Sequence, residues 1–502
     1  MSQQKNSTIN DLIKQYSSDL NYKNSETAII LAAGHGKRIK SQTSKMLHKI
    51  WGKSTVQRVY EACKNGLSKS NTIIVTGIKA EDVIKVIGNK KNNVFAFQEV
   101  QQGTGHAVQI ALKKIQKEKY NGTVYILPGD MGLIDDATLD KFKKEFLKSK
   151  TDMMVLTGMY DGKDPNENSY GRIVRVKPFD NNGNPSGKDT GKVIEIIEYK
   201  DILRLDEKIP YTRNFNGRNY SFTKDELIKN NEFNSGVFAF KFNFLVKLIS
   251  KISSNNAQGE IYITDLIALF NQNKLSVGAI SAEQQHVIMG FNNKSVLKEM
   301  DDIARKHVYE KLKDIIEIDD PDDFFIADDV MENIIEADKK GQPLDVKIGK
   351  GVYVGEGVKL NYNIKLRKNV YVMGNVIFGE NIIIGENVHL SCFPNQKLEI
   401  KNNVEILWGD IIKGNISIGE NTRIESSVNI TGSDEYPTRI GKNITIKGTS
   451  YVFGSIIDDD LFIEHSVLIK KKVDKLIRKD GKVQDIRFFL PMPEGIDAID
   501  EI

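Results

Sequence analysis

Two different spacings of apolar residues divide this chain. From Glu26 to about Gln285, short apolar runs that are typical of buried strands alternate with stretches of helical spacing. The strand-like runs are AIILAA, TIIVTG, VFAFQ, TVYILPGD and DMMVLTGMY, and the helical stretches include residues 54–64 and 105–115. Strands that alternate with helices predict a parallel α/β sheet, with ligand-binding loops at the carboxyl ends of its strands.

Beyond residue 340 the apolar residues recur at every sixth position, in two interleaved series. One series is Ile348, Val354, Leu360, Leu366, Val372, Phe378, Ile384 and Leu390, and the other is Val352, Val358, Ile364, Val370, Val376, Ile382 and Val388. The phase slips by four residues near 391–396 and slips again near 432–437. A hexapeptide period predicts a parallel β-helix in which insertions loop out at the corners.

These patterns and their flanks predict five segments. We expect a polar N-terminal extension at 1–25 with weak helical spacing, an α/β domain at 26–290, a helical connecting arm at 291–340, a β-helix at 341–470 and a tail at 471–502.

Composition excludes several classes of protein. The 71 basic and 67 acidic side chains give a net charge of +4, so no bulk field favours a nucleic-acid or membrane partner. Cys63 and Cys392 lie too far apart to suggest a metal cluster or a disulfide framework. No apolar run approaches the roughly 18 residues of a membrane span, and the N-terminus lacks the apolar core of a signal peptide. We therefore expect a cytoplasmic protein.

The loop after the first predicted strand carries candidate chemistry. Small residues end the strand at Ala32, Ala33 and Gly34, and the cations Arg38 and Lys45 follow. Backbone N–H groups can approach an anion closely where side chains are small, so this pattern indicates a phosphate-handling loop. Neither the dinucleotide fingerprint nor the P-loop motif fits its spacing.

Leu31 to Arg38 with Lys45 resembles the motif of sugar-nucleotide pyrophosphorylases, in particular the N-acetylglucosamine-1-phosphate uridylyltransferase family. Further blocks follow in the order of that family, namely Gln98-Glu99 with residues 103–107, Gly129-Asp130, residues 170–173, residues 197–201, residues 234–236, and residues 255–260 leading into 262–265. The resemblance implies a Rossmann-like nucleotidyltransferase domain followed by a left-handed β-helix with three hexads per coil.

The resemblance also implies a reaction, which is transfer of UMP from UTP to N-acetylglucosamine 1-phosphate with Mg²⁺ as cofactor. Arg38 and Lys45 would neutralise the triphosphate and the departing pyrophosphate. The other positions it implies are Leu31, Ala32, Ala33, Gly34, Gln98, Gly103 and Thr104 for the nucleotide, Gly171, Glu198 and Asn234 for the sugar, and Asp130 and Asn256 for the metal. His106 is expected to have a structural role, because an anionic phosphate oxygen needs no general base.

The chain departs from the family pattern at several places. Lys37 replaces a small hydroxyl residue, which adds a cation, and Ser44 replaces a proline, which loosens the turn. Residues 178–191 and 202–231 look inserted near the sugar site, so a pyrophosphorylase for another sugar 1-phosphate stays open. A non-catalytic sugar-nucleotide sensor subunit is a further alternative.

The predicted β-helix lacks the acetyltransferase motifs of bifunctional family members. Its only histidines are His389 and His465, and neither lies in the histidine motif. Residues 361–363 match the family's Asn-Tyr-Asp-Gly stretch poorly. We therefore expect a scaffold rather than an acyl-CoA-dependent transferase. The resemblance implies that it assembles a homotrimer.

Overall fold

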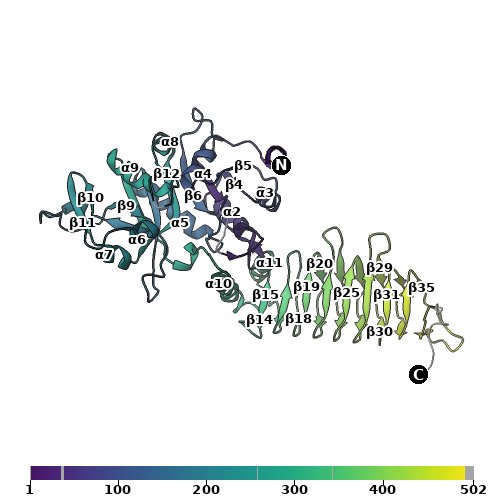
Figure 1. Cartoon of the computed structure of the whole chain (residues 1–502). Coiled ribbons are helices and arrows are strands. Elements are labelled where there is room, and N and C mark those ends of the chain that lie inside the picture. The colour runs from purple at the N-terminus through teal and green to yellow at the C-terminus, as the bar shows by residue number, and fades with distance from the viewer. Residues whose placement is uncertain (1, 35–38, 257, 342, 492–502) are drawn as a thin grey trace, which may run out of the picture. The chain divides into compact units, whose positions relative to one another are not determined.

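The computed structural model describes residues 2–34, 39–256, 258–341 and 343–491 (Figure 1). The chain divides into two compact units, Met1–Asp301 and Asp302–Ile502. Among the described residues, no helix has both the length and the apolarity needed to cross a membrane.

A nine-stranded sheet forms the centre of the first unit, and its main path runs β13-β7-β12-β6-β1-β4-β5. The neighbours β6, β1, β4 and β5 are parallel, whereas β12 runs antiparallel between β6 and β7. The sheet is therefore mixed, which corrects the expectation of a parallel sheet. Its strands are β1 (Glu26–Ala32), β4 (Asn71–Thr76), β5 (Asn93–Phe97), β6 (Thr123–Pro128), β7 (Met153–Met159), β8 (Arg172–Arg175), β9 (Val193–Ile197), β12 (Glu232–Lys241) and β13 (Val277–Ser281).

Helices cover both faces of this sheet. Successive residues of β1 alternate between two cores, with Ile30 in one and Ile29 in the other, as the period of a strand requires. The first core contains α1 (Ser2–Tyr16), α2 (Thr55–Gly66), α3 (Ala80–Ile87) and α5 (Asp136–Ser149), and the second contains α4 (Thr104–Leu112), α8 (Phe242–Ile249) and α9 (Leu266–Gln272). The N-terminal extension contains α1, which packs on the first core through Ile9 and Ile13.

The two inserted stretches fold into small ordered elements. In 202–231, β10 (Tyr211–Phe215) and β11 (Arg218–Phe222) pair as an antiparallel hairpin, and α7 (Lys224–Lys229) follows. A third, smaller apolar core holds this hairpin against β8, β9 and α6 (Tyr199–Leu203). In 178–191, a bridge joins Phe179 to Pro185.

The second unit is the left-handed parallel β-helix that the six-residue period predicts, with three parallel sheets (Figure 1). The helices α10 (Lys294–Leu312) and α11 (Asp328–Asp338) precede its main stack. One sheet contains β14 (Glu317–Ile318), β16 (Lys347–Ile348), β18 (Ile364–Leu366), β21 (Ile382–Ile384), β24 (Glu405–Ile406), β27 (Arg423–Ile424), β30 (Thr445–Lys447), β33 (Phe462–Glu464) and β36 (Ile486–Arg487). The second contains β15 (Phe324–Ile326), β17 (Val352–Val354), β19 (Tyr371–Met373), β22 (His389–Ser391), β25 (Ile411–Gly414), β28 (Asn429–Gly432), β31 (Tyr451–Phe453) and β34 (Val467–Ile469). The third contains β20 (Val376–Phe378), β23 (Leu398–Ile400), β26 (Ile416–Ile418), β29 (Thr438–Ile440), β32 (Ile456–Ile457) and β35 (Lys472–Val473).

A ladder of hydrogen-bonded asparagine side chains shows how many residues each coil contains. Asn363 donates to Asn381 at a separation of 18 residues, Asn381 donates to Asn403 at 22, and the next two steps are again 18 and 22. These asparagines have positive φ, which their short polar side chains tolerate at a tight corner. A coil is therefore three hexads, and the two longer coils contain the two predicted phase slips.

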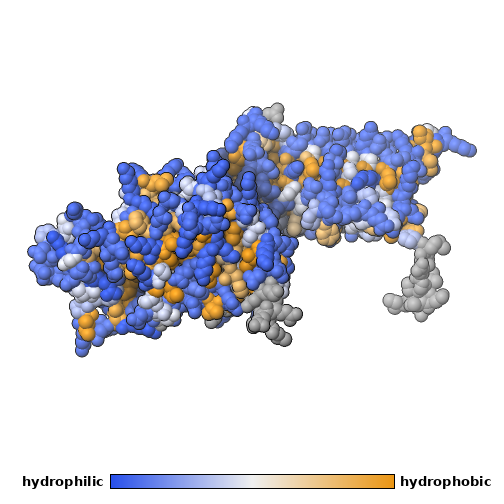
Figure 2. Space-filling model, turned by 90° about the horizontal axis from the view of Figure 1, so that it is seen from above, coloured by the Kyte–Doolittle hydropathy of each residue, from blue (hydrophilic) through white to orange (hydrophobic). Residues whose placement is uncertain are grey.

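The face of the molecule seen in Figure 2 is mostly polar. Figure 2 shows hydrophilic residues over most of the visible face, with apolar residues in separate patches. In the β-helix unit, the exposed large apolar side chains of the last coils and the tail are Ile456, Ile469, Leu476, Ile477, Phe488, Phe489 and Leu490.

Candidate functional site

The loops that follow β1, β4 and β6 meet at one edge of the sheet. The Gly129 N–H donates to the Leu31 carbonyl at 3.0 Å, so the end of β6 lies against the end of β1. A Cβ on Gly77 would lie 2.6 Å from the Ala33 carbonyl oxygen, so only glycine permits this approach after β4. The segment from Leu31 to Gly34 therefore lies at the predicted edge, whereas Arg38 lies outside the described residues.

Lys45 lies at the centre of this edge. Its ammonium pairs with the Asp130 carboxylate, donates to the Asn292 Oδ1 at 3.1 Å and lies 5.2 Å from the centroid of the Phe291 ring. Both ion-paired side chains are largely shielded from water, with exposed fractions of 12% for Lys45 and 16% for Asp130. Ser44 caps the short helix at Lys45–Leu47, because its side chain accepts from the Met46 N–H. Lys45 is therefore held by several contacts on an ordered turn.

The hydrogen bonds of Asn256, the predicted metal partner of Asp130, lie within its own turn. The Asn256 Oδ1 accepts from the backbone N–H groups of Gln258 and Glu260, both at 3.2 Å, and its Nδ2 donates to the Glu260 carbonyl. The carboxamide therefore stabilises its own turn. The Lys45 ammonium also brings a second asparagine, Asn292, to Asp130, and sequence reasoning missed this residue. The only feature of the sequence at this point is the pair Asn292-Asn293 just before a predicted helix. The role of Asn256 at the metal stays a prediction.

The segment that carries Asn292 is fixed to the rest of the site. Gly290 lies against the Asp130 carboxylate, since a Cβ there would be 3.4 Å from Asp130 Oδ2. Tyr170 donates its hydroxyl to the Gly290 carbonyl at 3.3 Å, and the His48 ring meets the Phe291 ring edge-on at 6.0 Å. Burial, and then the charge of Lys294, lower the pKa of His48.

A second part of the site surrounds Gln98 at the end of β5. Gln98 is only 3% exposed, and its Nε2 donates to the Gly103 carbonyl and to His106 Nδ1, both at 3.2 Å. His106 therefore orients Gln98, which is a structural role. Gly103 has φ +103°, and a Cβ there would lie 2.5 Å from the Ile261 carbonyl oxygen. Thr104 accepts from the Ile263 N–H at 3.2 Å, so the start of α4 is joined to a distant segment.

Gly171, Glu198 and Asn234 form a third part. A Cβ on Gly171 would lie 3.2 Å from both Glu198 carboxylate oxygens, and the Gly171 carbonyl accepts from the Asn234 N–H at 2.9 Å. Burial raises the pKa of Glu198 to about 7, with further increases from Asp201 and Asp265, although a hydrogen bond from Thr264 lowers it. These three predicted residues therefore do lie together, around a carboxyl group that titrates near neutral pH.

The third part is also tied to the end of β6. The β12 strand has a bulge after Asn234, and the Asn234 Oδ1 accepts from the Gly236 N–H at 2.8 Å. Gly236 has φ +85°, and a Cβ there would lie 2.8 Å from the Pro128 side chain. Because Pro128 precedes Asp130 by two residues, the bulge connects Asn234 to the strand end that carries the carboxylate.

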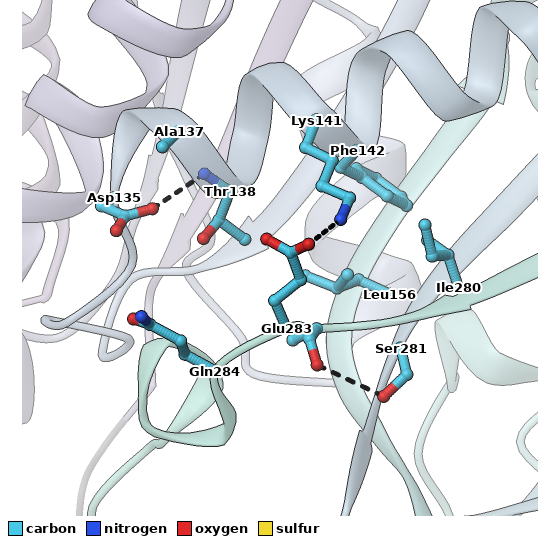
Figure 3. A pocket seen from close by; sticks show the side chains of 11 residues that line it. Asp135, Ala137, Thr138, Lys141, Phe142, Leu156, Ile280, Ser281, Glu283 and Gln284 are labelled. Carbon is cyan, nitrogen blue, oxygen red and sulfur yellow. Dashed lines mark hydrogen bonds and ion pairs between the residues drawn. The ribbon is translucent and has the colours of Figure 1, made fainter.

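A separate cavity of about 140 Å³ lies beside α5 and β13 (Figure 3). Asp135 caps α5 by accepting from the Thr138 N–H at 2.8 Å, and Lys141 pairs with Glu283. None of the predicted site residues lines this cavity. This cavity therefore adds nothing to the site.

Comparisons with known proteins agree with this picture of the first unit. Residues 28–166 match the model of the MobA-like NTP transferase domain. The bifunctional protein GlmU of Acetivibrio thermocellus is 33% identical over 304 residues, which are 60% of this chain and 57% of the relative. GlmU of Clostridium botulinum is 32% identical over 305 residues, with the same coverage. The chain thus spans less than two thirds of the length of these relatives.

Among solved structures, a UDP-glucose pyrophosphorylase complexed with UDP-glucose aligns with a TM-score of 0.39 at 16% identity, covering 56% of this chain and 99% of that one. The family match places Lys45, Gln98 and Asp130 within the matched residues. Residues 28–166 therefore match the MobA-like NTP transferase domain model, the chain is similar in sequence to bifunctional GlmU proteins, and it continues into a left-handed parallel β-helix.

Proposed function

We propose that this chain is a Mg²⁺-dependent uridylyltransferase that converts UTP and N-acetylglucosamine 1-phosphate into UDP-N-acetylglucosamine and pyrophosphate. The observation that carries the proposal is the convergence of Lys45, Asp130 and Asn292 beside the small-residue loop that follows β1. Phosphoryl transfer requires positioned cations and oxygen ligands for a metal more than it requires covalent chemistry by the protein.

The oxygen atoms at this edge fit a magnesium ion. An Asp130 carboxylate oxygen and the Asn292 Oδ1 both contact one cation, the Lys45 ammonium, so the pair can share a positive charge. One carboxylate and one amide are sufficient for Mg²⁺, which retains water and phosphate oxygens as its other ligands. When bound, Mg²⁺ would neutralise charge on the phosphates.

The substrates themselves undergo the bond changes, and the residues of the chain position them. An oxygen of the sugar phosphate attacks the α-phosphorus of UTP, the new P–O bond forms, and the bond to pyrophosphate breaks. Lys45 stabilises the charge that gathers on the departing pyrophosphate, and the sequence resemblance gives Arg38 the same role. Gln98, oriented by His106, would present its Oε1 to the uracil edge, as a carboxamide can.

The sugar is assigned to Gly171, Glu198 and Asn234. Glu198 and Asn234 can hydrogen-bond hydroxyl and acetamido groups, and Gly171 lets the backbone approach closely. The choice of N-acetylglucosamine among sugar 1-phosphates rests on the sequence resemblance, and the inserted hairpin packs against β8 and β9 next to these residues. A different sugar 1-phosphate is therefore the main alternative within the same reaction.

A pyrophosphate-release assay tests the proposal. Purified full-length protein, UTP and Mg²⁺ are combined with a panel of sugar 1-phosphates, and we expect the highest kcat/KM with N-acetylglucosamine 1-phosphate. Lys45→Met should lower the rate at least roughly a hundredfold, because it removes the cation at similar length. Lys49→Met, which removes an exposed lysine on the neighbouring strand, is the matched control. No turnover with any sugar phosphate would reject the proposal in favour of a sensor subunit.

We propose in addition that the β-helix assembles the chain into a homotrimer, as the resemblance implies. Light scattering of the full-length protein at micromolar concentration should give three times the 56.6 kDa chain mass. A monomer mass would contradict this assembly and leave the proposed reaction unaffected.

A further inference from the structure

The largest fully buried side chain among the described residues is a charged one, Arg172. It begins β8, directly after Gly171, and its exposed fraction is 0%. No carboxylate pairs with its guanidinium within the part of the chain that the structure describes. Burying a cation without a counter-ion is costly, so a residue of this kind needs a compensating role.

The guanidinium is bound by backbone carbonyl groups of one short loop. It donates to the carbonyl oxygens of Pro165 at 3.2 Å and Asn168 at 2.7 Å, and also to that of Tyr170. Its remaining contact is the face of the Tyr199 ring, 5.3 Å away. Arg172 thus gathers three carbonyl dipoles from residues 165–170 around one planar cation.

This loop leads directly into the proposed sugar site. Tyr170 stacks on Phe233 at 4.7 Å, and its hydroxyl donates to the Gly290 carbonyl, next to the Asp130 carboxylate. Gly171 follows and lies against Glu198. The shape that Arg172 imposes on the loop therefore determines where Tyr170 and Gly171 lie.

Only arginine can make this set of contacts. Its guanidinium has five donors in a rigid planar fork and stacks on aromatic rings, whereas a lysine ammonium is a compact point charge on a flexible stem. An apolar residue would fill the space without the desolvation cost, but it would leave one buried and two part-buried carbonyl groups without their donor.

We propose that Arg172 is a positioning residue that sets the affinity and selectivity for the sugar 1-phosphate by holding the loop 165–170, an inference that rests on the proposed function. Arg172 does not touch the reacting phosphates in this scheme. It acts through Tyr170 and Gly171, so its loss should affect the sugar phosphate far more than UTP.

Steady-state kinetics of Arg172→Lys and Arg172→Met test this. We expect the KM for N-acetylglucosamine 1-phosphate to rise at least roughly tenfold, and the KM for UTP to stay within about twofold. The preference for N-acetylglucosamine 1-phosphate over glucose 1-phosphate should also fall. Arg175→Lys and Arg175→Met are the matched controls, because Arg175 lies on the same strand but pairs with Glu232 through Nε and Nη2, both at 2.6 Å.

Hydrogen exchange of the full-length protein gives a second readout that does not depend on turnover. Amides of residues 166–171 should exchange faster in Arg172→Lys than in the wild type and in Arg175→Lys. Equal increases in both KM values, equal effects of the Arg175 variants, or unchanged exchange would each overturn the inference. If the wild type turns over no sugar phosphate, the proposed function fails, and faster exchange would still support Arg172 as the residue that holds this loop.

Discussion

A single buried carboxyl group should make the stability of the β-helix depend on pH. Asp410 comes directly before β25 and is 0% exposed. In the neighbouring coils the equivalent position is a valine, namely Val388 before β22 and Val428 before β28. One carboxylate oxygen accepts from the Val428 N–H at 2.7 Å, and the other has no partner among the described residues. Burial raises the pKa of Asp410 from 3.8 to about 8, against smaller decreases from backbone hydrogen bonds.

The sign of the effect follows from this raised pKa. The folded state binds the proton more tightly than the unfolded state, so stability is highest below about pH 4 and falls as the pH rises toward 8. Each pH unit within that window costs about 1.4 kcal/mol of unfolding free energy, so the full cost at pH 7 is about 4 kcal/mol. Partial hydration of the ionised group reduces this cost, and we expect a measured loss of about 2 to 4 kcal/mol.

The perturbation is Asp410→Asn, which keeps an oxygen for the Val428 N–H and cannot ionise. Thermal unfolding of the full-length protein from pH 5 to 8.5 should show the β-helix transition falling with pH in the wild type and staying nearly level in the variant. At about 2–4 °C per kcal/mol for a unit of this size, a loss of about 2 to 4 kcal/mol makes the two differ by roughly 4–16 °C at pH 8. Glu420→Gln makes the same charge change at an exposed position and should retain the wild-type slope. Identical pH slopes in the wild type and Asp410→Asn would refute the reasoning.

The remaining predictions concern activity. Asp130→Asn and Asn292→Ala should each lower turnover on the order of a hundredfold, because both remove an oxygen proposed to bind the metal, whereas Asn256→Ala should lower it less; a larger loss in Asn256→Ala would identify Asn256 as the metal ligand, as the sequence resemblance implies. Gly103→Ala should raise the KM for UTP strongly, because a Cβ would meet the Ile261 carbonyl oxygen at 2.5 Å; isothermal titration with UTP measures this loss, and normal affinity would contradict the proposed base site. We expect no thiol release from acetyl-CoA with glucosamine 1-phosphate, and turnover that His389→Ala abolishes would overturn the scaffold assignment.

The six-residue period predicted the β-helix in detail because the coil itself creates that period. Each hexad must direct apolar side chains into the stack, so the register between coils is already visible as spacing in the sequence. Both slips appear at the expected places as coils of 22 residues instead of 18. The burial of Asp410 could not be predicted in the same way, since a polar residue at an inward position looks like an interruption of the apolar repeat.

The mixed sheet shows that the sequence of one strand does not predict the direction in which that strand runs. The segment of β12 has the apolar pattern of any buried strand, and that pattern does not record strand direction. Direction is set by the connections, and here β12 pairs antiparallel with both β6 and β7. The predicted placement of Leu31 and Asp130 at strand ends was unaffected, because Leu31 lies near the end of β1 and Asp130 follows β6, and these two strands are parallel.

The two asparagines show what a sequence omits about a metal ligand. A ligand oxygen needs lone pairs that the protein has not already used, and it must converge with other oxygens on one point in space. Asn256 has a loop sequence that looks suitable, but its Oδ1 already accepts two backbone N–H groups of its own turn. Asn292 directs its Oδ1 to the same ammonium that pairs with Asp130. Because an ion could take the place of that ammonium between the two oxygens, we propose Asn292 as a candidate ligand beside Asn256, and only the folded chain brings this second asparagine to view.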